Sequence, residues 1–481
     1  MWGDLYVNKE RLVWDLCLIV SWVWSSFLVD SSVVWTGWSV LLSLWSVYYV
    51  DNGYFLRRWP VMSPIYMLIV FQSLLWMAGF HTSSALYKYT TSFCLLLSTL
   101  NGIFLFPAFD LPKLSSSGEE KKYHVGITGP IYCCDKQISI RVFYPAQSTT
   151  TTSSKTMPYL CDLQHGLEML QELLCMTAPW NATKERDTFF SSIFYGWSCG
   201  NIPNATKDAL PMTHTTNFPC IIYSHGLFGN THLYTSIAHA MAERGYIVVS
   251  LTHSDGSAVG AKSHDGSTIP YDNSYHRKKN YSEAEKARRK QILQRIQECQ
   301  QITQHLIQHS TNILTNTTAT TTNNIIIPID VDNILLMGHS YGGATVLATA
   351  LQQQGQQQQI YKGVIAHDPA TGWIPDTERE KLYNHHHTTN PDDQKIKMLL
   401  LYSQQWYDMK WGGIQQIPSA QYISGTHHSD FSDICFLLPL WLAQDVLKMT
   451  GPRPPTQSAT EIIQRTVSFC RSCLVQPTKE T

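Results

Sequence analysis

Hydrophobic residues are distributed very differently in the first quarter of the chain and in the remainder. Four apolar and aromatic stretches, at residues 12–28, 33–50, 64–80 and 91–106, follow one another, and apart from Asp15 in the first stretch the charges are confined to the short breaks between them. Each is long enough to cross the hydrocarbon core of a bilayer as a helix. Trp and Tyr crowd the ends of the stretches, as they do at membrane interfaces. This pattern predicts a bundle of about four transmembrane helices within residues 1–110.

Two other interpretations of this region fit less well. A signal peptide has a single apolar region, which would not be followed by three more. The helices of a soluble bundle would carry a polar stripe on the face turned to water, and such stripes are scarce here. We therefore expect an integral, multi-pass membrane protein.

Basic residues around these stretches predict how the protein is oriented in the membrane. They precede the first stretch, separate the second from the third and follow the fourth, at Lys9, Arg11, Arg57, Arg58, Lys113, Lys121 and Lys122. By the positive-inside rule, both ends of the chain and its large C-terminal part face the cytosol. Asn-x-Ser/Thr sequons occur in the C-terminal part, at Asn181, Asn204, Asn280 and Asn316. Glycosylation of these sequons would instead require the luminal side, which leaves that alternative open.

Beyond a Pro- and Ser-containing linker at residues 111–119, the pattern becomes that of a soluble domain at residues 120–475. Short apolar runs alternate there with helix-like segments, and the runs lie at residues 138–144, 220–223, 247–251, 334–337, 363–366 and 398–402. Such alternation predicts an α/β fold, with a largely parallel sheet covered by helices on both faces. Polar low-complexity tracts at residues 149–155, 315–324 and 352–359 are predicted to be surface loops.

The longest predicted helix spans residues 276–310. Its apolar face is formed by Ile292, Ile296, Cys299, Thr303 and Leu306. Basic residues cluster near its start, at Arg277, Lys278, Lys279, Lys286, Arg288, Arg289 and Lys290. A solvated helix face is one interpretation of this cluster, and contact with anionic lipid headgroups is the other.

The run at residues 334–337 is followed by the pentapeptide Gly-His-Ser-Tyr-Gly at residues 338–342 and then by a small, apolar, helix-like segment. Glycine at both outer positions permits a strand-to-helix turn so sharp that side chains there would collide with neighbouring backbone. In such a turn the serine hydroxyl and the N–H of the next residue project into one cleft. This context predicts that Ser340 is a nucleophile, with an ordinary turn as the alternative.

Polar groups follow two other apolar runs, and in a parallel sheet the chemistry lies at these strand ends. A His-Gly turn comes after residues 220–223 and predicts that the backbone N–H of Leu227 forms an oxyanion hole with that of Tyr341. The alternative is an ordinary strand-to-helix turn. Asp368 comes after residues 363–366, where a carboxylate can orient a histidine; a helix N-cap is the alternative.

The histidine of such a site must follow the serine and the acid in chain order. His427 and His428 lie on a loop after the last predicted core strand. Only one of them can be the base, because neighbouring side chains point apart, and spacing alone does not choose between them. Histidines that precede Asp368, at positions 225, 253, 339 and 367, are expected to support the site or the fold.

Composition excludes some classes of function. The formal net charge is −1, so no basic field would attract nucleic acid. The twelve cysteines show no framework spacing, and the single Cys-x-x-Cys at residues 470–473 is interpreted as two thiols on the last helix. We expect no metal or cofactor. Nothing in the sequence indicates an oligomeric state.

The segments that carry these groups resemble the platelet-activating factor acetylhydrolase family, which has the α/β-hydrolase fold. The matching segments are IRVFYP at residues 140–145, YSHGL at 223–227, HSDGSA at 253–258, MGHSYGGAT at 337–345 and GTHHSDF at 425–431. The resemblance extends over nearly all of residues 120–475 and does not cover residues 1–110. In relatives a Trp closely follows the acid, whereas here four residues separate Asp368 from Trp373, which puts the acyl-chain preference in question.

The resemblance implies specific roles. Ser340 would be the nucleophile, Asp368 the acid and His428 the base, with Leu227 and Tyr341 supplying the oxyanion amides. It implies a calcium-independent serine esterase that hydrolyses the short or oxidised sn-2 acyl ester of glycerophospholipids. Together with the predicted transmembrane region, this leads us to expect a membrane-anchored enzyme that draws its substrate from the bilayer. Two alternatives remain: a hydrolase of another specificity (neutral lipid, thioester or general carboxylesterase), and a non-catalytic membrane scaffold.

Overall fold

The computed structural model of this 481-residue chain describes residues 123–133, 138–147, 156–159, 201–212, 217–272, 281–309, 327–353, 359–385, 396–417, 419–437 and 441–474. The four predicted membrane spans and the linker at residues 111–119 lie outside these segments, as do the tracts at residues 149–155 and 315–324. No helix within the described segments combines the length and the apolar character needed to cross a bilayer. The predicted spans therefore remain predictions.

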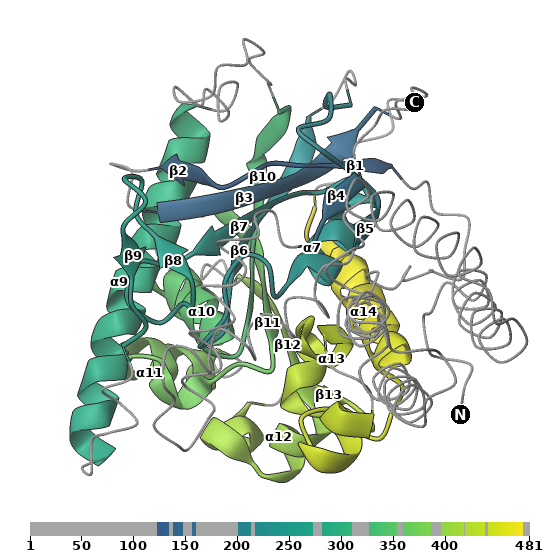
Figure 1. Cartoon of the computed structure of the whole chain (residues 1–481). Helices are drawn as coiled ribbons and strands as arrows, with labels where there is room; N and C mark the ends of the chain where they lie inside the picture. The colour runs from purple at the N-terminus through teal and green to yellow at the C-terminus, as the bar shows by residue number, and fades with distance from the viewer. Residues whose placement is uncertain are drawn as a thin grey trace, which may run out of the picture.

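An eleven-stranded mixed sheet forms the centre of the described part (Figure 1). Its main path runs in the order β13 (Gln421–Ile423), β12 (Lys397–Ser403), β11 (Tyr361–His367), β10 (Ile329–His339), β6 (Phe218–Ser224), β7 (Ile247–Thr252), β3 (Ile138–Ala146), β1 (His124–Ile127), β5 (Asn201–Lys207) and β4 (Thr156–Pro158), and β2 (Ile131–Cys133) pairs with β3. A separate hairpin joins β8 (Ala261–Lys262) to β9 (Thr268–Ile269). All six predicted strands are confirmed, each extended by one to several residues.

The prediction of a largely parallel sheet is correct for one half of it and wrong for the other. Each neighbouring pair from β13 to β7 is parallel. Antiparallel pairing begins where β7 meets β3 and continues in the pairs β3–β1, β3–β2 and β5–β4, while β1–β5 is parallel. For the pairs β3–β1 and β3–β2 the physical reason is local: β1, β2 and β3 follow one another within residues 124–146, and connections this short cannot make the crossover that a parallel pair needs.

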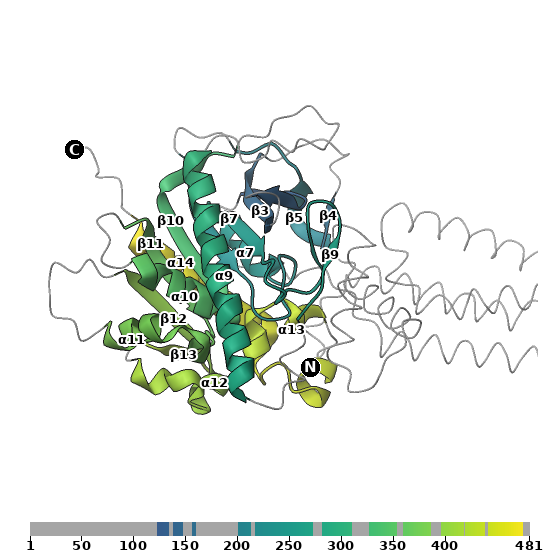
Figure 2. The ribbon, with the colours of Figure 1, turned by 90° about the vertical axis from the view of Figure 1, so that its left-hand side faces the viewer.

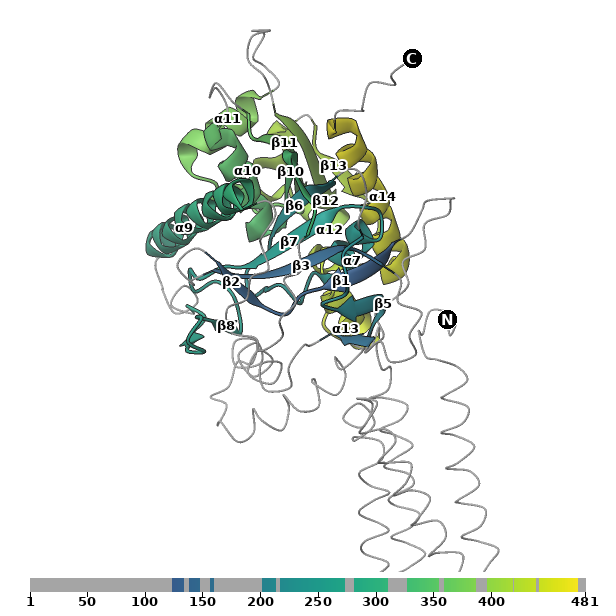
Figure 3. The same ribbon diagram turned by 90° about the horizontal axis from the view of Figure 1, so that it is seen from above.

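Helices cover both faces of the sheet (Figures 2 and 3). On one face lie α9 (Tyr281–Gln308), α10 (Tyr341–Gln353) and α11 (Asp376–Asn384); on the other lie α7 (Thr235–Ala242) and α14 (Pro455–Cys473). Alternate residues of a central strand serve the two faces, so Leu336 packs in the first core and Leu335 in the second. Burial on both faces explains why these strands are continuous apolar runs.

The remaining short elements follow the parallel strands β11, β12 and β13 along the chain. They are η1 (Thr371–Trp373), α12 (Gln404–Asp408), η2 (Trp411–Gln416), η3 (His428–Phe431), α13 (Ile434–Leu437) and the π-helical turn η4 (Trp441–Val446). Cys470 and Cys473 are free thiols buried on α14, as predicted. The surface loop predicted at residues 352–359 begins later than expected, because Gln352 and Gln353 still belong to α10.

Helix α9 confirms the predicted apolar face, since its five members are at most 2% exposed. The basic cluster is corrected in part. Arg288 is buried and donates to the Tyr271 hydroxyl and Gln291, and Arg289 pairs with Asp376. Lys286 and Lys290 are exposed, and residues 277–279 lie outside the described segments. The cluster is therefore not one continuous solvated face.

Candidate active site

Ser340 lies in the turn between β10 and α10, in a backbone conformation that is unusual for serine. Its φ is +57°, a left-handed conformation that costs a residue with a side chain free energy. Strand β11 and the loop after it hold this conformation. The N–H of Ser340 donates to the carbonyl of His367 at 2.9 Å, and its own carbonyl accepts from the N–H of Ala370 at 2.9 Å. The side chain is thereby presented at the end of the sheet.

The two glycines of the pentapeptide are required by close approach. An ideal Cβ on Gly342 would lie 2.1 Å from the carbonyl oxygen of Ser224, and one on Gly338 would lie 2.4 Å from the carbonyl oxygen of Gly342. The start of α10 thus packs directly on the end of β6. This contact brings the serine turn beside the His-Gly turn that follows β6.

Gly342→Ala should destabilise the protein, because backbone atoms on two elements would have to separate to admit the methyl group. We expect a loss of about 3 kcal/mol or more in the free energy of unfolding, at the upper end of overpacking effects. The midpoint of thermal unfolding of the full chain in detergent measures it. Gly129→Ala is the matched control, since its Cβ would approach only the Lys207 side chain, at 3.8 Å. Equal midpoints for the two variants would contradict the packing argument.

The structure brings together the three side chains that the sequence proposed for the site. Ser340 Oγ lies 2.9 Å from Nε2 of His428, and Nδ1 of the same ring lies 2.6 Å from Oδ2 of Asp368. The carboxylate is fully buried, whereas the His428 side chain is 26% exposed. His427 is directed elsewhere, with its Nδ1 3.2 Å from the carbonyl of Lys448. The structure therefore places His428, and not His427, in contact with Ser340.

Ser403 holds the Asp368 carboxylate from the neighbouring strand β12. The Ser403 N–H donates to Oδ1 at 2.9 Å and its hydroxyl donates to Oδ2 at 2.7 Å. Asp368 is not a helix N-cap, because the next helical turn begins at Thr371 with Ala370 as its cap. Sequence reasoning missed Ser403. The one available signal was its position directly after the apolar run at residues 398–402.

The His428 ring is also packed by an aromatic pair that the sequence did not reveal. Trp406 stacks on it with ring centroids 3.8 Å apart and planes 9° apart, and Trp411 stacks on Trp406 at 4.3 Å. The N–H of His428 donates to Gln405 Oε1 at 3.1 Å. These contacts restrict rotation of the ring. Nothing in their spacing distinguishes the two tryptophans from ordinary core residues.

A chain of hydrogen bonds connects the His-Gly turn to His428. The N–H of Gly226 donates to the Tyr234 hydroxyl at 3.0 Å, which lies 3.0 Å from Nδ1 of His339. Nε2 of His339 lies 3.1 Å from the carbonyl of His428. Because that carbonyl can only accept, His339 carries its proton on Nε2, and Tyr234 donates to Nδ1. These hydrogen bonds thus hold the His-Gly turn and the segment of His428 in a fixed position relative to each other.

The buried histidines are neutral. Burial lowers the pKa of His367 to about 3 and, with the neighbouring His428, lowers the pKa of His339 well below its usual value. Burial, with the Arg295 guanidinium, likewise lowers the pKa of His225 well below its usual value. Protonation of these rings is therefore strongly disfavoured.

The turn that carries Leu227 and the helix that begins at Tyr341 both adjoin Ser340. An ideal Cβ on Gly226 would lie 3.1 Å from the Cβ of Ser340, so the turn that carries Leu227 lies against the serine. Tyr341 is the first residue of α10, and an N–H in the first helical turn has no acceptor within the helix. Within the described part of the chain, the N–H of Leu227 donates no hydrogen bond. Both amides are available to a ligand.

The same residues include the one metal-type cluster found in the described segments. Potential ligand atoms of His339, Asp368 and His428 lie within 4.8 Å of one another. Both nitrogens of each ring and both carboxylate oxygens already take part in the hydrogen bonds given above. Lone pairs that a metal ion would need are in use, so this arrangement fits proton transfer better than metal binding.

Comparison with known proteins assigns the family. The model of "Platelet-activating factor acetylhydrolase, isoform II" matches residues 119–476. A platelet-activating factor acetylhydrolase of Gallus gallus is 26% identical over 50% of this chain and 60% of its own length. That of Bos taurus is 29% identical over 48% of this chain and 51% of its own length. The chain thus spans between half and three fifths of these relatives.

A solved structure of a ferulic acid esterase from Streptomyces cinnamoneus is similar with a TM-score of 0.46 at 12% identity, over 76% of this chain and 96% of that one. This likeness is too low to add to the family assignment. The mixed sheet, the helices on both faces and the serine turn after β10 form an α/β-hydrolase-like fold. Since the family model covers most of the chain, this protein belongs to the platelet-activating factor acetylhydrolase, isoform II, family.

Proposed function

We propose that this protein is a calcium-independent serine esterase that removes the short or oxidised sn-2 acyl group of a glycerophospholipid. The observation that carries the proposal is the continuous line of contacts from Ser340 Oγ through the His428 ring to the Asp368 carboxylate. Such a line is the arrangement that activates a serine hydroxyl. The substrate class follows from the relatives, which are named platelet-activating factor acetylhydrolases.

Acylation uses the three side chains and the two amides. Ser340 Oγ attacks the ester carbonyl while Nε2 of His428 takes its proton. The buried Asp368 carboxylate accepts the Nδ1–H and stabilises the imidazolium that forms. Negative charge develops on the carbonyl oxygen, and the N–H groups of Leu227 and Tyr341 donate to it. When the tetrahedral intermediate collapses, His428 returns the proton to the departing glycerol oxygen, which releases the lyso-phospholipid.

Deacylation repeats the cycle with water. His428 accepts a proton from water as the water oxygen attacks the acyl-serine, and the same two amides hold the second oxyanion. The proton then passes to Ser340 Oγ as the ester bond breaks. The products are the free serine and acetate or another short acid. No step requires calcium.

We also propose that residues 1–110 anchor the protein in a bilayer by about four helices, with the catalytic domain facing the cytosol. The apolar stretches and the distribution of basic residues in the sequence support this proposal. An anchor of this kind would keep the esterase at the surface from which its lipid substrate is drawn. Protease protection and glycosylation of the full chain in microsomes test the orientation: protected, glycosylated protein would contradict it.

The test of the function uses the full chain in detergent or vesicles with calcium chelated. Phospholipids with sn-2 chains from acetyl to palmitoyl are compared with a neutral acetate ester and a thioester, and a fluorophosphonate probe labels the active serine. We expect turnover to fall with sn-2 chain length and the label to map to Ser340. Ser267→Ala is the labelling control, since Ser267 is exposed on the β8–β9 hairpin.

Each other outcome contradicts a defined part of the proposal. Labelling at Ser340 with preference for long-chain, neutral or thioester substrates would indicate a hydrolase of another specificity. Absence of labelling in folded protein would favour a non-catalytic membrane scaffold. Loss of activity on chelation would contradict the calcium-independent mechanism.

A further inference from the structure

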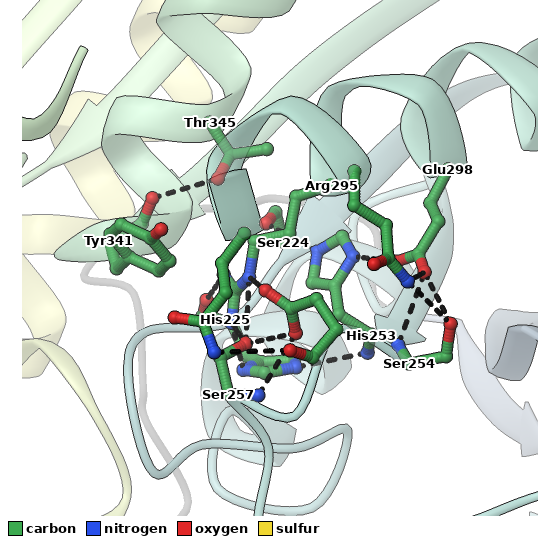
Figure 4. Close-up of polar contacts among 12 residues, drawn as sticks. Ser224, His225, His253, Ser254, Ser257, Arg295, Glu298, Tyr341 and Thr345 are labelled. Carbon is green, nitrogen blue, oxygen red and sulfur yellow. Dashed lines mark hydrogen bonds and ion pairs between the residues drawn. The ribbon is translucent and has the colours of Figure 1, made fainter. Parts of the chain in front are cut away.

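A second Ser–His–acid array is formed by Ser224, His253 and Glu298 (Figure 4). Ser224 Oγ lies 2.8 Å from Nε2 of His253, and Nδ1 of that ring lies 2.6 Å from Oε2 of Glu298. Ser224 and His253 are fully buried, and Glu298 is 4% exposed. No substrate can reach a hydroxyl with no exposed surface, so this array is not a second nucleophile. Its position indicates another use, because Ser224 directly precedes the His-Gly turn.

The array holds the segment around His253 in place. The Glu298 carboxylate accepts from His253 Nδ1 and also from the N–H of Ser254 at 3.2 Å and from its hydroxyl at 2.5 Å. Since a carboxylate can only accept, the proton of His253 lies on Nδ1, and Nε2 accepts from the Ser224 hydroxyl. The strand ends of β6 and β7 are thereby tied to each other and to α9. This aims the backbone N–H of His253 at the ring of His225.

The backbone N–H of His253 determines which nitrogen of His225 carries the proton. It donates to Nε2 of His225 at 3.1 Å, so Nε2 is unprotonated and the ring proton is on Nδ1. Nδ1 of His225 lies 2.6 Å from the carbonyl oxygen of Gly226 and donates to it. Arg295 Nη2 also lies 3.3 Å from this Nδ1, but two donors cannot bond to each other, so that approach is a contact and not a hydrogen bond. The N–H of Gly229 donates to the carbonyl oxygen of Gly226 at 3.1 Å. The Gly226 carbonyl is therefore held from two directions.

This carbonyl belongs to the same peptide unit as the proposed oxyanion amide. The C=O of Gly226 and the N–H of Leu227 share one plane and, in a trans peptide, point in opposite directions. Holding the carbonyl toward His225 consequently turns the N–H away from that ring. The preceding peptide unit is held too, because Arg295 Nη1 donates to the carbonyl of His225 at 2.6 Å. Arg295 is fully buried and its guanidinium lies 4.7 Å from the centre of the Tyr341 ring.

We propose that His225 is a positioning residue that orients the Leu227 amide for the oxyanion, with the Ser224–His253–Glu298 array and Arg295 as its rigid support. The proposal rests on the proposed esterase function. His225 does not touch the substrate; it acts through one peptide plane. Without its donor, the Gly226–Leu227 peptide keeps a single hydrogen bond, from Gly229, and can rotate its N–H out of the cleft.

Two substitutions separate this role from ordinary core packing. The side-chain amide of His225→Asn places an N–H donor close to the position of Nδ1, whereas His225→Leu has similar bulk and no donor. Both variants lose the acceptor for the N–H of His253, so both should lose stability to a similar extent. Only the Leu variant loses the donor to the Gly226 carbonyl. We expect its kcat to fall by about 10²–10³-fold, the usual effect of losing one oxyanion donor, with KM changed little.

The kinetics are measured with p-nitrophenyl acetate as well as with the phospholipid, so that the physiological substrate does not affect the result. His225→Asn should stay within about tenfold of wild type in kcat while its thermal midpoint matches that of His225→Leu. Where the Leu variant does not fold, His225→Ala replaces it, and added imidazole should restore part of kcat. Equal kcat for the Asn variant and the donor-free variant, or unchanged kcat in the latter, would overturn the positioning role.

An inactive wild type would be a different result. It would overturn the proposed esterase function, and the positioning role with it, before any variant is compared. An active wild type with unaffected His225 variants would overturn the positioning role alone.

Discussion

Ser340→Ala is expected to reduce ester hydrolysis by at least about 10⁴-fold, because it removes the atom that becomes acylated. Ser340 Oγ lies 2.9 Å from Nε2 of His428. The methyl group of alanine in its place can neither give up a proton nor form a bond to the ester carbonyl. The residual rate would come from the oxyanion amides and a water molecule in place of the hydroxyl. KM should change little, since the substrate is held mainly by groups that the substitution leaves intact.

The measurement compares kcat of the full chain and of Ser340→Ala on an sn-2 acetyl phospholipid with calcium chelated. Circular dichroism and the thermal midpoint show that the variant is folded. Ser267→Ala, on the exposed hairpin, should retain full activity and excludes a general effect of losing a hydroxyl. Comparable turnover by wild type and Ser340→Ala would end the serine mechanism.

Asp368→Asn should reduce kcat by about 10⁴-fold through the tautomer of His428. The N–H of Ser403 donates to Oδ1 of Asp368 at 2.9 Å, so the asparagine must keep its oxygen at that position. Its NH₂ group then takes the place of Oδ2, 2.6 Å from His428 Nδ1. Two donors cannot face each other, and the ring therefore moves its proton to Nε2. In that tautomer Nε2 cannot accept the proton of Ser340.

The matched control is Asp376→Asn, because Asp376 is an exposed carboxylate on α11 that pairs with Arg289 of α9 and with Arg379 of its own helix. It should leave kcat within about twofold of wild type, since surface pairs of this kind contribute little. The rate of fluorophosphonate labelling at Ser340 is a second readout. It should fall in Asp368→Asn, where the His428 tautomer changes, and stay unchanged in Asp376→Asn. A loss of less than about tenfold in Asp368→Asn would show that the carboxylate does not set the tautomer.

The elements that could be predicted are those specified by residues close together in the sequence. Strands β6, β10 and β11 are buried on both faces, which requires continuous apolar runs that can be read without knowing their neighbours. The serine turn is also local, because Gly338 and Gly342 are demanded by contacts at the turn itself. Asp368 could be predicted because it directly follows a buried strand in a sheet whose strand ends carry chemistry.

Other features were missed because they depend on which strands are neighbours. Ser403 holds Asp368 only because β11 lies beside β12, across 35 residues of chain. Arg295 was part of a helix predicted from periodicity, yet nothing in that period shows that it reaches the carbonyl of His225. The antiparallel half of the sheet was missed for the same reason, since alternation of strands and helices does not reveal how residues 124–146 pair.

The sequence by itself determined the apolar strands, the serine turn, the acid after β11 and the pair of histidines from which the base had to come, because each is set by residues close together in the chain. Only the tertiary structure decided that His428 and not His427 meets Ser340, that Ser403 holds the acid, and that His225 contacts the carbonyl of Gly226. These three contacts depend on distances and tautomers across neighbouring strands. Such geometry exists only once the sheet has assembled, so no local pattern can specify it.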